Sequence, residues 1–190
     1  MRARGSGEPR RRWSPRVLVL GLGNLILRDD GVGVHAARQF ASVAPRGVLV
    51  IDAGTDVFST VHLLTRADKT VAFDALRGGR KPGTVYILDA SDVANDAATG
   101  SLHELGLPSV LQTINGHKSE VVVVAAEPEI IEVGTELSPA LQAAVPEMVR
   151  AALALTSHWL SLSPAGIRPA TDLSAVSQLV KLRQVETPRM

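Results

Sequence analysis

Acidic side chains follow three apolar runs of this 190-residue sequence, at the points where those runs end. Asp52 closes the run VLVID, Asp74 closes TVAFD, and the doublet Asp29-Asp30 follows VLVLG across a glycine-containing turn. His103 stands later, ahead of another apolar run. If the runs are parallel strands of one sheet, their carboxyl ends meet at one edge, outside the core. Two aspartates and one histidine gathered there predict a divalent metal site with open coordination positions.

Each of these residues also has an ordinary structural interpretation. Either member of the Asp29-Asp30 doublet could cap a helix that begins near residue 31, although adjacent residues cannot both be the cap. Asp52 and Asp74 could be turn residues at strand ends, and His103 could simply stand at the start of a helix or on the surface. Spacing alone leaves both interpretations open.

The elements that must position these residues alternate between strand and helix. Continuous apolar runs predict strands buried on both faces, and segments of helical periodicity predict helices between them. We expect strands near 17–21, 48–52, 70–74, 84–88 and 120–126, and helices near 31–42, 56–66, 104–114 and 139–161. This alternation is typical of an α/β fold, here three α/β/α layers around a twisted, mostly parallel sheet of about five strands.

Connection lengths and prolines refine this prediction. Residues 75–83 join the third and fourth strands, and about nine residues are too few for a parallel crossover. We therefore expect the strand at 84–88 to be antiparallel and the others to be parallel, with right-handed crossovers. In the last helix, Ser138 and Pro139 form a cap followed by a first-turn proline, while Pro146 should kink the helix or delay its start.

The composition predicts one globular domain flanked by two tails. The chain has 45% hydrophobic and 21% charged residues, which is ordinary for a globular protein. Because it contains no cysteine, it can have no disulfide, thiolate nucleophile or cysteine-bound metal. Arginine is concentrated in the first 16 residues. We expect a disordered basic tail over 1–16, a single α/β domain over 17–162, and a C-terminal tail over 163–190 with at most one short helix near 172–184.

Several functional classes fit this sequence poorly. An aromatic content of 3% offers little for stacking on bases, so the basic tail alone does not indicate nucleic-acid binding. No apolar run approaches the ~18 residues of a membrane span, and Asn24 and the charges at 28–30 interrupt a possible secretory signal. We therefore expect a cytoplasmic protein without nucleic-acid or membrane partners. The G-x-S-x-G motif of serine hydrolases is also missing.

A dinucleotide-binding oxidoreductase is one alternative. Gly21 and Gly23 follow a strand, and Asp52 ends the next strand, which matches part of the dinucleotide-binding motif. Ile26 occupies the third glycine position and should prevent the close approach of helix and strand that the motif encodes. The Asp29-Asp30 doublet also places negative charge at the helix N-terminus, where a pyrophosphate would bind.

A longer series of motifs runs through residues 17–160. It comprises VLVLGLGNLILRDDGVGV at 17–34, IDAGT at 51–55, AFDA at 72–75, KPGT at 81–84, LHELGL at 102–107, EPE at 127–129 and LSP at 137–139. In this order the motifs resemble the hydrogenase maturation endopeptidases. The resemblance implies a twisted sheet between helices with one antiparallel strand. It also implies removal of a C-terminal extension from the large-subunit precursor of a nickel–iron hydrogenase, after nickel insertion.

The resemblance also assigns functional residues. It implies that Asp30, Asp74 and His103 bind the metal and carry catalysis, with Asp30 at a position where the family often has glutamate. Asp52 matches an acidic position proposed to help sense the substrate's metal. Gly54-Thr55 is a candidate for holding the extended substrate tail through backbone hydrogen bonds. The nickel would come with the precursor, and other divalent cations could occupy the same ligands.

Two catalytic routes fit these residues. The metal could polarise the scissile carbonyl, or a carboxylate could activate the attacking water, so a metal-dependent and an aspartic-type peptidase both fit. A non-catalytic module that senses nickel is a further alternative. The Gly78-Gly79 loop could grip the substrate or be a flexible turn, and His35 could face the site or serve only in packing.

Overall fold

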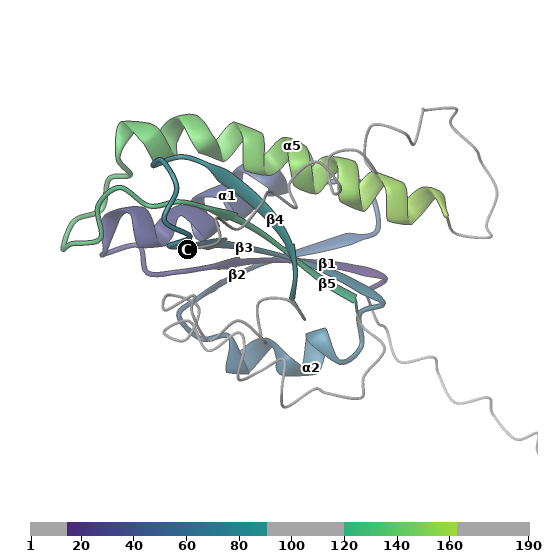
Figure 1. The fold of residues 1–190 in the computed structure, drawn as a ribbon. Coiled ribbons are helices and arrows are strands. Elements are labelled where there is room, and N and C mark those ends of the chain that lie inside the picture. Colours follow the sequence, from purple (N-terminus) through teal and green to yellow (C-terminus); the bar gives the residue numbers. More distant parts are fainter. Residues whose placement is uncertain (1–14, 91–119, 163–190) are drawn as a thin grey trace, which may run out of the picture.

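The computed structural model describes residues 15–90 and 120–162 (Figure 1). Several predicted features lie outside these residues. They are the basic tail up to residue 14, His103, the helix near 104–114, and the C-terminal tail with its short helix near 172–184.

Five strands form one mixed sheet in the order β2-β1-β3-β5-β4. They are β1 (Val17–Leu22), β2 (Val48–Gly54), β3 (Lys69–Ala75), β4 (Val85–Asp89) and β5 (Glu120–Ala126). β1 pairs in parallel with β2 and β3, and β3 pairs in parallel with β5, whereas β4 runs antiparallel along β5. The antiparallel strand predicted from the short connection is confirmed, as are the five strand positions.

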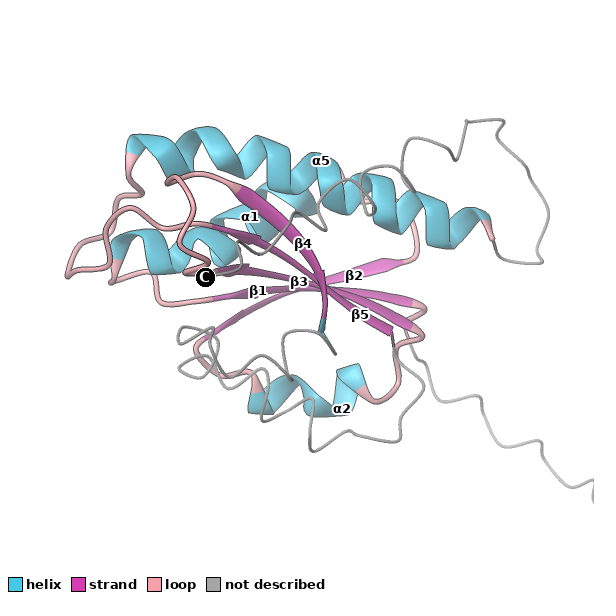
Figure 2. Cartoon of the chain, in the orientation of Figure 1, coloured by secondary structure: helices cyan, strands magenta, loops and turns pink. Residues whose placement is uncertain are grey.

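Helices cover both faces of the sheet and make three layers, as predicted (Figures 1 and 2). On one face lie α1 (Val32–Ala41), preceded by the 3-10 helix η1 (Arg28–Gly31), and α5 (Pro139–Ser161). On the other face lie the 3-10 helix η2 (Phe58–Thr60) and α2 (Val61–Leu64), which are shorter than the helix expected over 56–66. A separate apolar core fills the space on each face of the sheet.

The start of α5 follows the predicted cap. Ser138 Oγ accepts a hydrogen bond from Leu141 N at 3.4 Å, and Pro139 occupies the first turn, where its missing N–H costs nothing. The helix then continues through Pro146, so a delayed start at that proline is wrong. α5 packs along α1 and across the sheet, and this packing stabilises the helix despite the proline.

Two glycines let α1 lie directly against the strands. A β-carbon at Gly33 would lie 2.3 Å from Phe73 O and 2.4 Å from Leu22 O, and one at Gly21 would lie 2.5 Å from Ala37 Cβ. The expectation that Ile26 prevents close approach is therefore wrong, because Gly21 and Gly33 provide it. As a result, the start of α1 lies beside the carboxyl ends of β1 and β3.

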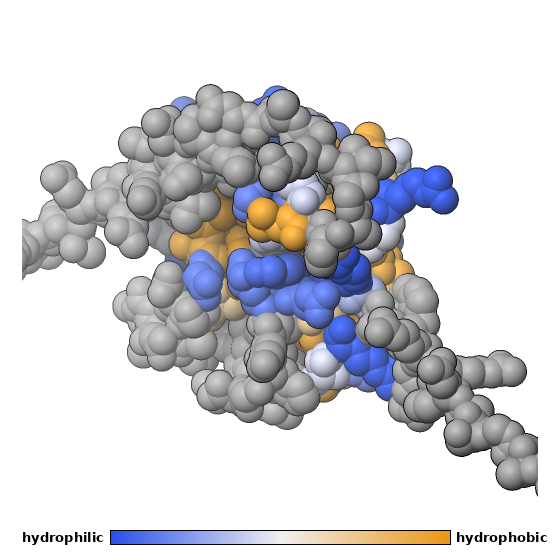
Figure 3. Space-filling view, turned by 90° about the vertical axis from the view of Figure 1, so that its right-hand side faces the viewer, coloured by the Kyte–Doolittle hydropathy of each residue, from blue (hydrophilic) through white to orange (hydrophobic). Residues whose placement is uncertain are grey.

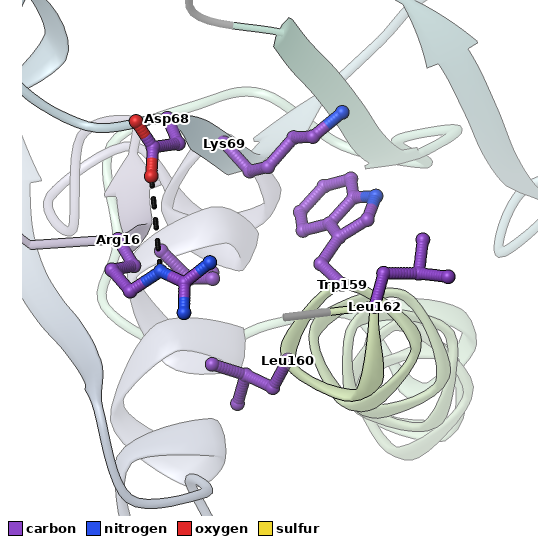
Figure 4. A pocket seen from close by; sticks show the side chains of 7 residues that line it. Arg16, Asp68, Lys69, Trp159, Leu160 and Leu162 are labelled. Atoms are coloured by element: carbon purple, nitrogen blue, oxygen red, sulfur yellow. Dashed lines mark ion pairs between the residues drawn. The ribbon is translucent and has the colours of Figure 1, made fainter. Parts of the chain in front are cut away.

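A pocket of about 200 Å³ lies at the opposite edge of the sheet, where β1 and β3 begin (Figure 4). Its lining is Arg16, Val17, Asp68, Lys69, Trp159, Leu160 and Leu162. The Lys69 ammonium lies 5.8 Å from the centre of the Trp159 ring, and Arg16 Nε lies 3.8 Å from the Asp68 carboxylate. Figure 3 shows hydrophilic surface beside hydrophobic surface at this end. The lengths of β1 and β3 separate this pocket from the predicted site residues.

Within 15–90 and 120–162, no helix has both the length and the apolar character needed to cross a membrane.

Candidate functional site

Asp74 lies within β3, one residue before its end, and has no exposed surface. Its Oδ1 accepts a hydrogen bond from Ala75 N at 2.7 Å, but its buried Oδ2 has no hydrogen-bond partner among the described residues. Burial raises the pKa of Asp74 well above its ordinary value, and the negative charge of Asp30 adds to the rise. The expectation that this carboxylate lies outside the core is wrong. A buried carboxyl oxygen without a hydrogen-bond partner is energetically costly.

Asp30 is held by the turn that follows β1. Its Oδ2 accepts a hydrogen bond from Asn24 N at 2.8 Å. Gly23 has a φ of 111°, and a β-carbon there would lie 1.8 Å from the carbonyl oxygen of Asp30, so only glycine fits. Gly31 is the N-cap of α1 without a side-chain hydrogen bond, so neither aspartate caps that helix. η1, which carries Asp30, packs against β3, which carries Asp74, so both residues belong to the edge where β1 and β3 end.

Asp29 points into the protein and holds a distant loop. Its Oδ2 accepts hydrogen bonds from Glu129 N and Ile130 N, both at 2.9 Å, and its Oδ1 accepts one from Ser138 N at 2.6 Å. Burial opposes ionisation, but these hydrogen bonds outweigh it and hold the pKa of Asp29 below its ordinary value. Asp29 is therefore the structural member of the doublet.

Asp52 lies in β2, opposite Gly21 of β1. Its Oδ2 accepts hydrogen bonds from Nε and Nη2 of Arg38 at 3.0 and 2.8 Å. This exposed ion pair ties β2 to α1 and compensates the charge of Asp52. The structure therefore places Asp52 on the same edge as Asp30, but pairs it with a cation of its own.

Gly54 joins the end of β2 to the turn that carries Asp30. Its carbonyl accepts a hydrogen bond from Gly23 N at 3.0 Å, and its φ of 52° is in the left-handed region that favours glycine. Thr55 follows on the exposed surface. The predicted role of these two residues in holding a substrate tail stays a prediction.

Sequence reasoning gave no role to Glu127, which follows β5 and is only 6% exposed. Its Oε2 accepts hydrogen bonds from Gly78 N at 2.8 Å, from Arg80 N at 3.1 Å and from the Tyr86 hydroxyl. Burial first, and then Glu127, raise the pKa of Tyr86. Glu127 thus ties the turn at Gly78-Gly79 to the end of β5. The signal was present, since Glu127 ends an apolar run as Asp52 and Asp74 do.

Removing the Glu127 side chain should destabilise the protein. Glu127→Ala leaves two N–H groups and a hydroxyl without their acceptor, so the free energy of unfolding should fall by about 2–4 kcal/mol. Glu127→Gln keeps a carbonyl acceptor and should lose roughly half as much. Urea denaturation measures both variants. Equal stability of Glu127→Ala and the wild type would show that the turn does not depend on this carboxylate.

His35 lies on α1, and its Nε2 is buried without a hydrogen-bond partner among the described residues. Burial and then the charge of Arg38 lower the pKa of His35. A neutral, half-buried ring fits the packing role that was one of its two expected interpretations.

The structure describes two of the three predicted metal ligands. Residues 15–90 and 120–162 contain no group of three His, Asp or Glu side chains that could hold an ion. Asp30 and Asp74 supply two carboxylates, and the third predicted ligand, His103, lies outside the described residues. The unpartnered Oδ2 of Asp74 nevertheless suits a cation, because a positive charge there would compensate two neighbouring carboxylates.

Comparison with known proteins gives a consistent result. A family model described as hydrogenase maturation protease, HycI, matches residues 34–155. The hydrogenase expression/formation protein HoxM of Cupriavidus necator is 31% identical over 152 residues, which cover 75% of each chain. HupD of Rhizobium leguminosarum bv. viciae is 29% identical over 154 residues, covering 77% of this chain and 76% of that protein.

Solved structures show the same likeness. The hydrogenase maturating endopeptidase HybD from E. coli matches with a TM-score of 0.68 and 27% identity, covering 75% of this chain and 93% of that one. The [NiFe] hydrogenase maturation protease HybD from Thermococcus kodakarensis matches with a TM-score of 0.58 and 30% identity, covering 74% of this chain and 98% of that one.

Proposed function

Because the chain belongs to the hydrogenase maturation protease family, we propose that it removes the C-terminal extension of a nickel–iron hydrogenase large-subunit precursor once nickel has been inserted. The observation that carries this proposal is the Asp74 carboxylate, which is fully buried, has an unpartnered Oδ2 and lies within the field of Asp30. Family membership gives no support to the oxidoreductase alternative.

In this proposal the precursor's nickel is recognised by two carboxylates and one imidazole, from Asp30, Asp74 and His103. Nickel accepts both ligand types. Without a cation the two carboxylates repel each other, by on the order of 1–4 kcal/mol for charges ~4 Å apart at effective dielectric constants of 80 to 20. Burial, and then the charge of Asp30, raise the pKa of Asp74. A nickel-loaded precursor supplies the missing positive charge between these two side chains.

Two routes to hydrolysis use these groups. The substrate's metal, once bound, supplies Lewis acidity that polarises the scissile carbonyl or acidifies a water molecule. Alternatively, the Asp30 carboxylate accepts a proton from the attacking water and then passes it to the leaving amine. The first route makes the enzyme metal-dependent, and the second makes it an aspartic-type peptidase. Both routes use the Asp30 carboxylate.

The neighbouring residues extend the proposal to the substrate's tail and metal. We propose that Gly54-Thr55 contacts the extended tail beside the β1 turn. The expected metal-sensing role of Asp52 requires its pair with Arg38 to open, because both hydrogen bonds from Arg38 end on the same carboxylate oxygen. Sensing by Asp52 is therefore coupled to the position of Arg38 on α1.

Incubation with matched nickel-loaded and nickel-free precursors tests the proposal. The protein should shorten only the nickel-loaded precursor on a denaturing gel, because only that form compensates the two carboxylates. Shortening of both forms would contradict metal recognition. Binding of the nickel-loaded form without cleavage would favour the nickel-sensing module instead.

A further inference from the structure

Large apolar side chains stand exposed on the edge of the sheet that carries Asp30 and Asp74. Ile26 is 61% exposed in the loop after β1, and Val133 is 86% exposed in the loop after β5. Phe58, which follows the carboxyl end of β2, is 60% exposed. Scattered apolar residues are ordinary on a protein surface, but several at one functional edge indicate an interaction surface.

Ile26 and Val133 belong to loops that the backbone joins. Gly134 N donates a hydrogen bond to Ile26 O at 3.0 Å, and Arg28 N donates one to Gly134 O at 2.9 Å. Leu27 and Gly134 thereby form an isolated parallel bridge. The side chains of Ile26 and Val133, together with this bridge, are called the 26/133 ridge below.

Contacts of Arg28 and Asp29 fix the two loops that carry the 26/133 ridge. Arg28 has a φ of 49°, a conformation that a non-glycine residue keeps only when its neighbours hold it. A β-carbon at Gly134 would lie 2.9 Å from Arg28 Cγ, so the arginine stem packs closely over that glycine. Arg28 Nη1 also lies 3.3 Å from Glu132 Oε1, and buried Asp29 binds the same loop through three backbone N–H groups.

Hydrogen bonds of Asn24 connect the 26/133 ridge to the candidate metal site. Asn24 N donates to the Asp30 carboxylate at 2.8 Å, and Asn24 Oδ1 accepts from Ile26 N at 3.1 Å. A partner that contacts Ile26 therefore lies beside the carboxylate that the proposed function assigns to nickel. Because the loops are already ordered, docking on them loses little conformational entropy.

We propose that the 26/133 ridge docks an apolar surface of the folded, nickel-loaded precursor beside Asp30 and Asp74. This inference rests on the proposed function. Protruding side chains suit a depression on a folded partner better than an extended peptide, which needs pockets or an open strand edge. The ridge therefore contributes to affinity for the whole precursor, and the carboxylates contribute to its chemistry.

The double variant Ile26→Ser/Val133→Ser tests the ridge. The matched control is Val43→Ser/Leu162→Ser, which removes two apolar side chains that are 52% and 64% exposed, one just beyond the end of α1 and the other just beyond the end of α5. For the nickel-loaded precursor, the ridge variant should raise KM and the dissociation constant about tenfold or more, with kcat within about twofold. The control variant should have the wild-type KM, dissociation constant and kcat. Both variants should melt within a few degrees of the wild type.

Three other outcomes separate precursor docking on the ridge from its alternatives. Unchanged affinity and KM in the ridge variant overturn the inference, even if the wild type cleaves the precursor. Ridge-dependent binding without any cleavage by the wild type supports the ridge and rejects the proposed function. If the wild type is dimeric, the ridge variant is monomeric and precursor affinity is unchanged, the ridge binds a second copy of this chain, and the inference is wrong.

Discussion

Replacement of Asp74 by asparagine should abolish cleavage of the nickel-loaded precursor and raise the melting temperature at neutral pH. The amide keeps an acceptor for Ala75 N, but it carries no charge and cannot replace a carboxylate as a nickel ligand. Because the wild type must either bind a proton to this fully buried carboxyl group on folding or leave it charged, whereas the amide is neutral at every pH, the variant should gain about 1–3 kcal/mol, which corresponds to roughly 3–10 °C for a domain of this size.

The pH dependence of this gain has a definite sign. The pKa of Asp74 is raised in the folded state, so between the ordinary value of 3.8 and the raised pKa the native state binds a proton that the unfolded state lacks. The contribution of Asp74 to stability is therefore full below pH 3.8 and is lost as pH rises through the folded-state pKa. The difference in melting temperature between Asp74→Asn and the wild type should grow over that window.

Thermal unfolding between pH 4 and 8, combined with the precursor cleavage assay, measures both effects. For thermal unfolding alone, Asp52→Asn is the matched control, because it removes an exposed carboxylate on the same sheet edge whose ion pair contributes at most about 1 kcal/mol. A variant at position 74 that still cleaves, or that is less stable than the wild type at every pH, would contradict the role assigned to this buried group.

Replacement of Asp29 by alanine should lower the free energy of unfolding by about 3–5 kcal/mol, because an ionised acceptor of three backbone N–H groups is lost. The folded-state pKa of Asp29 is depressed, so its contribution is full above the ordinary value of 3.8 and is lost as pH falls through the folded-state pKa. The penalty for the alanine variant should therefore shrink in acid.

Urea denaturation at pH 7 and pH 3 measures this effect. Glu132→Gln is the control in the same loop, because it removes only the ion pair with Arg28 and should change stability by less than about 1 kcal/mol. If Asp29→Ala and Glu132→Gln had equal stability, the loop after β5 would not depend on the buried carboxylate.

The features that sequence predicted correctly depend on short segments. Apolar runs located the five strands, and the length of residues 75–83 determined the direction of β4. The division of roles within Asp29-Asp30 could not be predicted in this way. Asp29 is buried because its hydrogen-bond donors come from residues 129–138, about a hundred positions away in the chain.

The remaining differences have the same origin in long-range packing. Asp74 was expected at an open edge, but it has no exposed surface in the folded chain. Two of the three partners of Glu127 are backbone groups of a turn that precedes β4, which no residue pattern specifies. Composition and periodicity identify the strand ends that carry the acids, whereas burial and pairing of each acid depend on the assembled fold.

In the proposed function, Asp30, Asp74 and His103 hold one divalent ion between them. Anomalous diffraction from crystals soaked in nickel measures where such an ion binds. We expect a single strong peak about 2.0–2.4 Å from a carboxylate oxygen of Asp30, from Oδ2 of Asp74 and from an imidazole nitrogen of His103. A peak that omits Asp74, or one beside Asp52 with Asp30 and Asp74 left without metal, would contradict it.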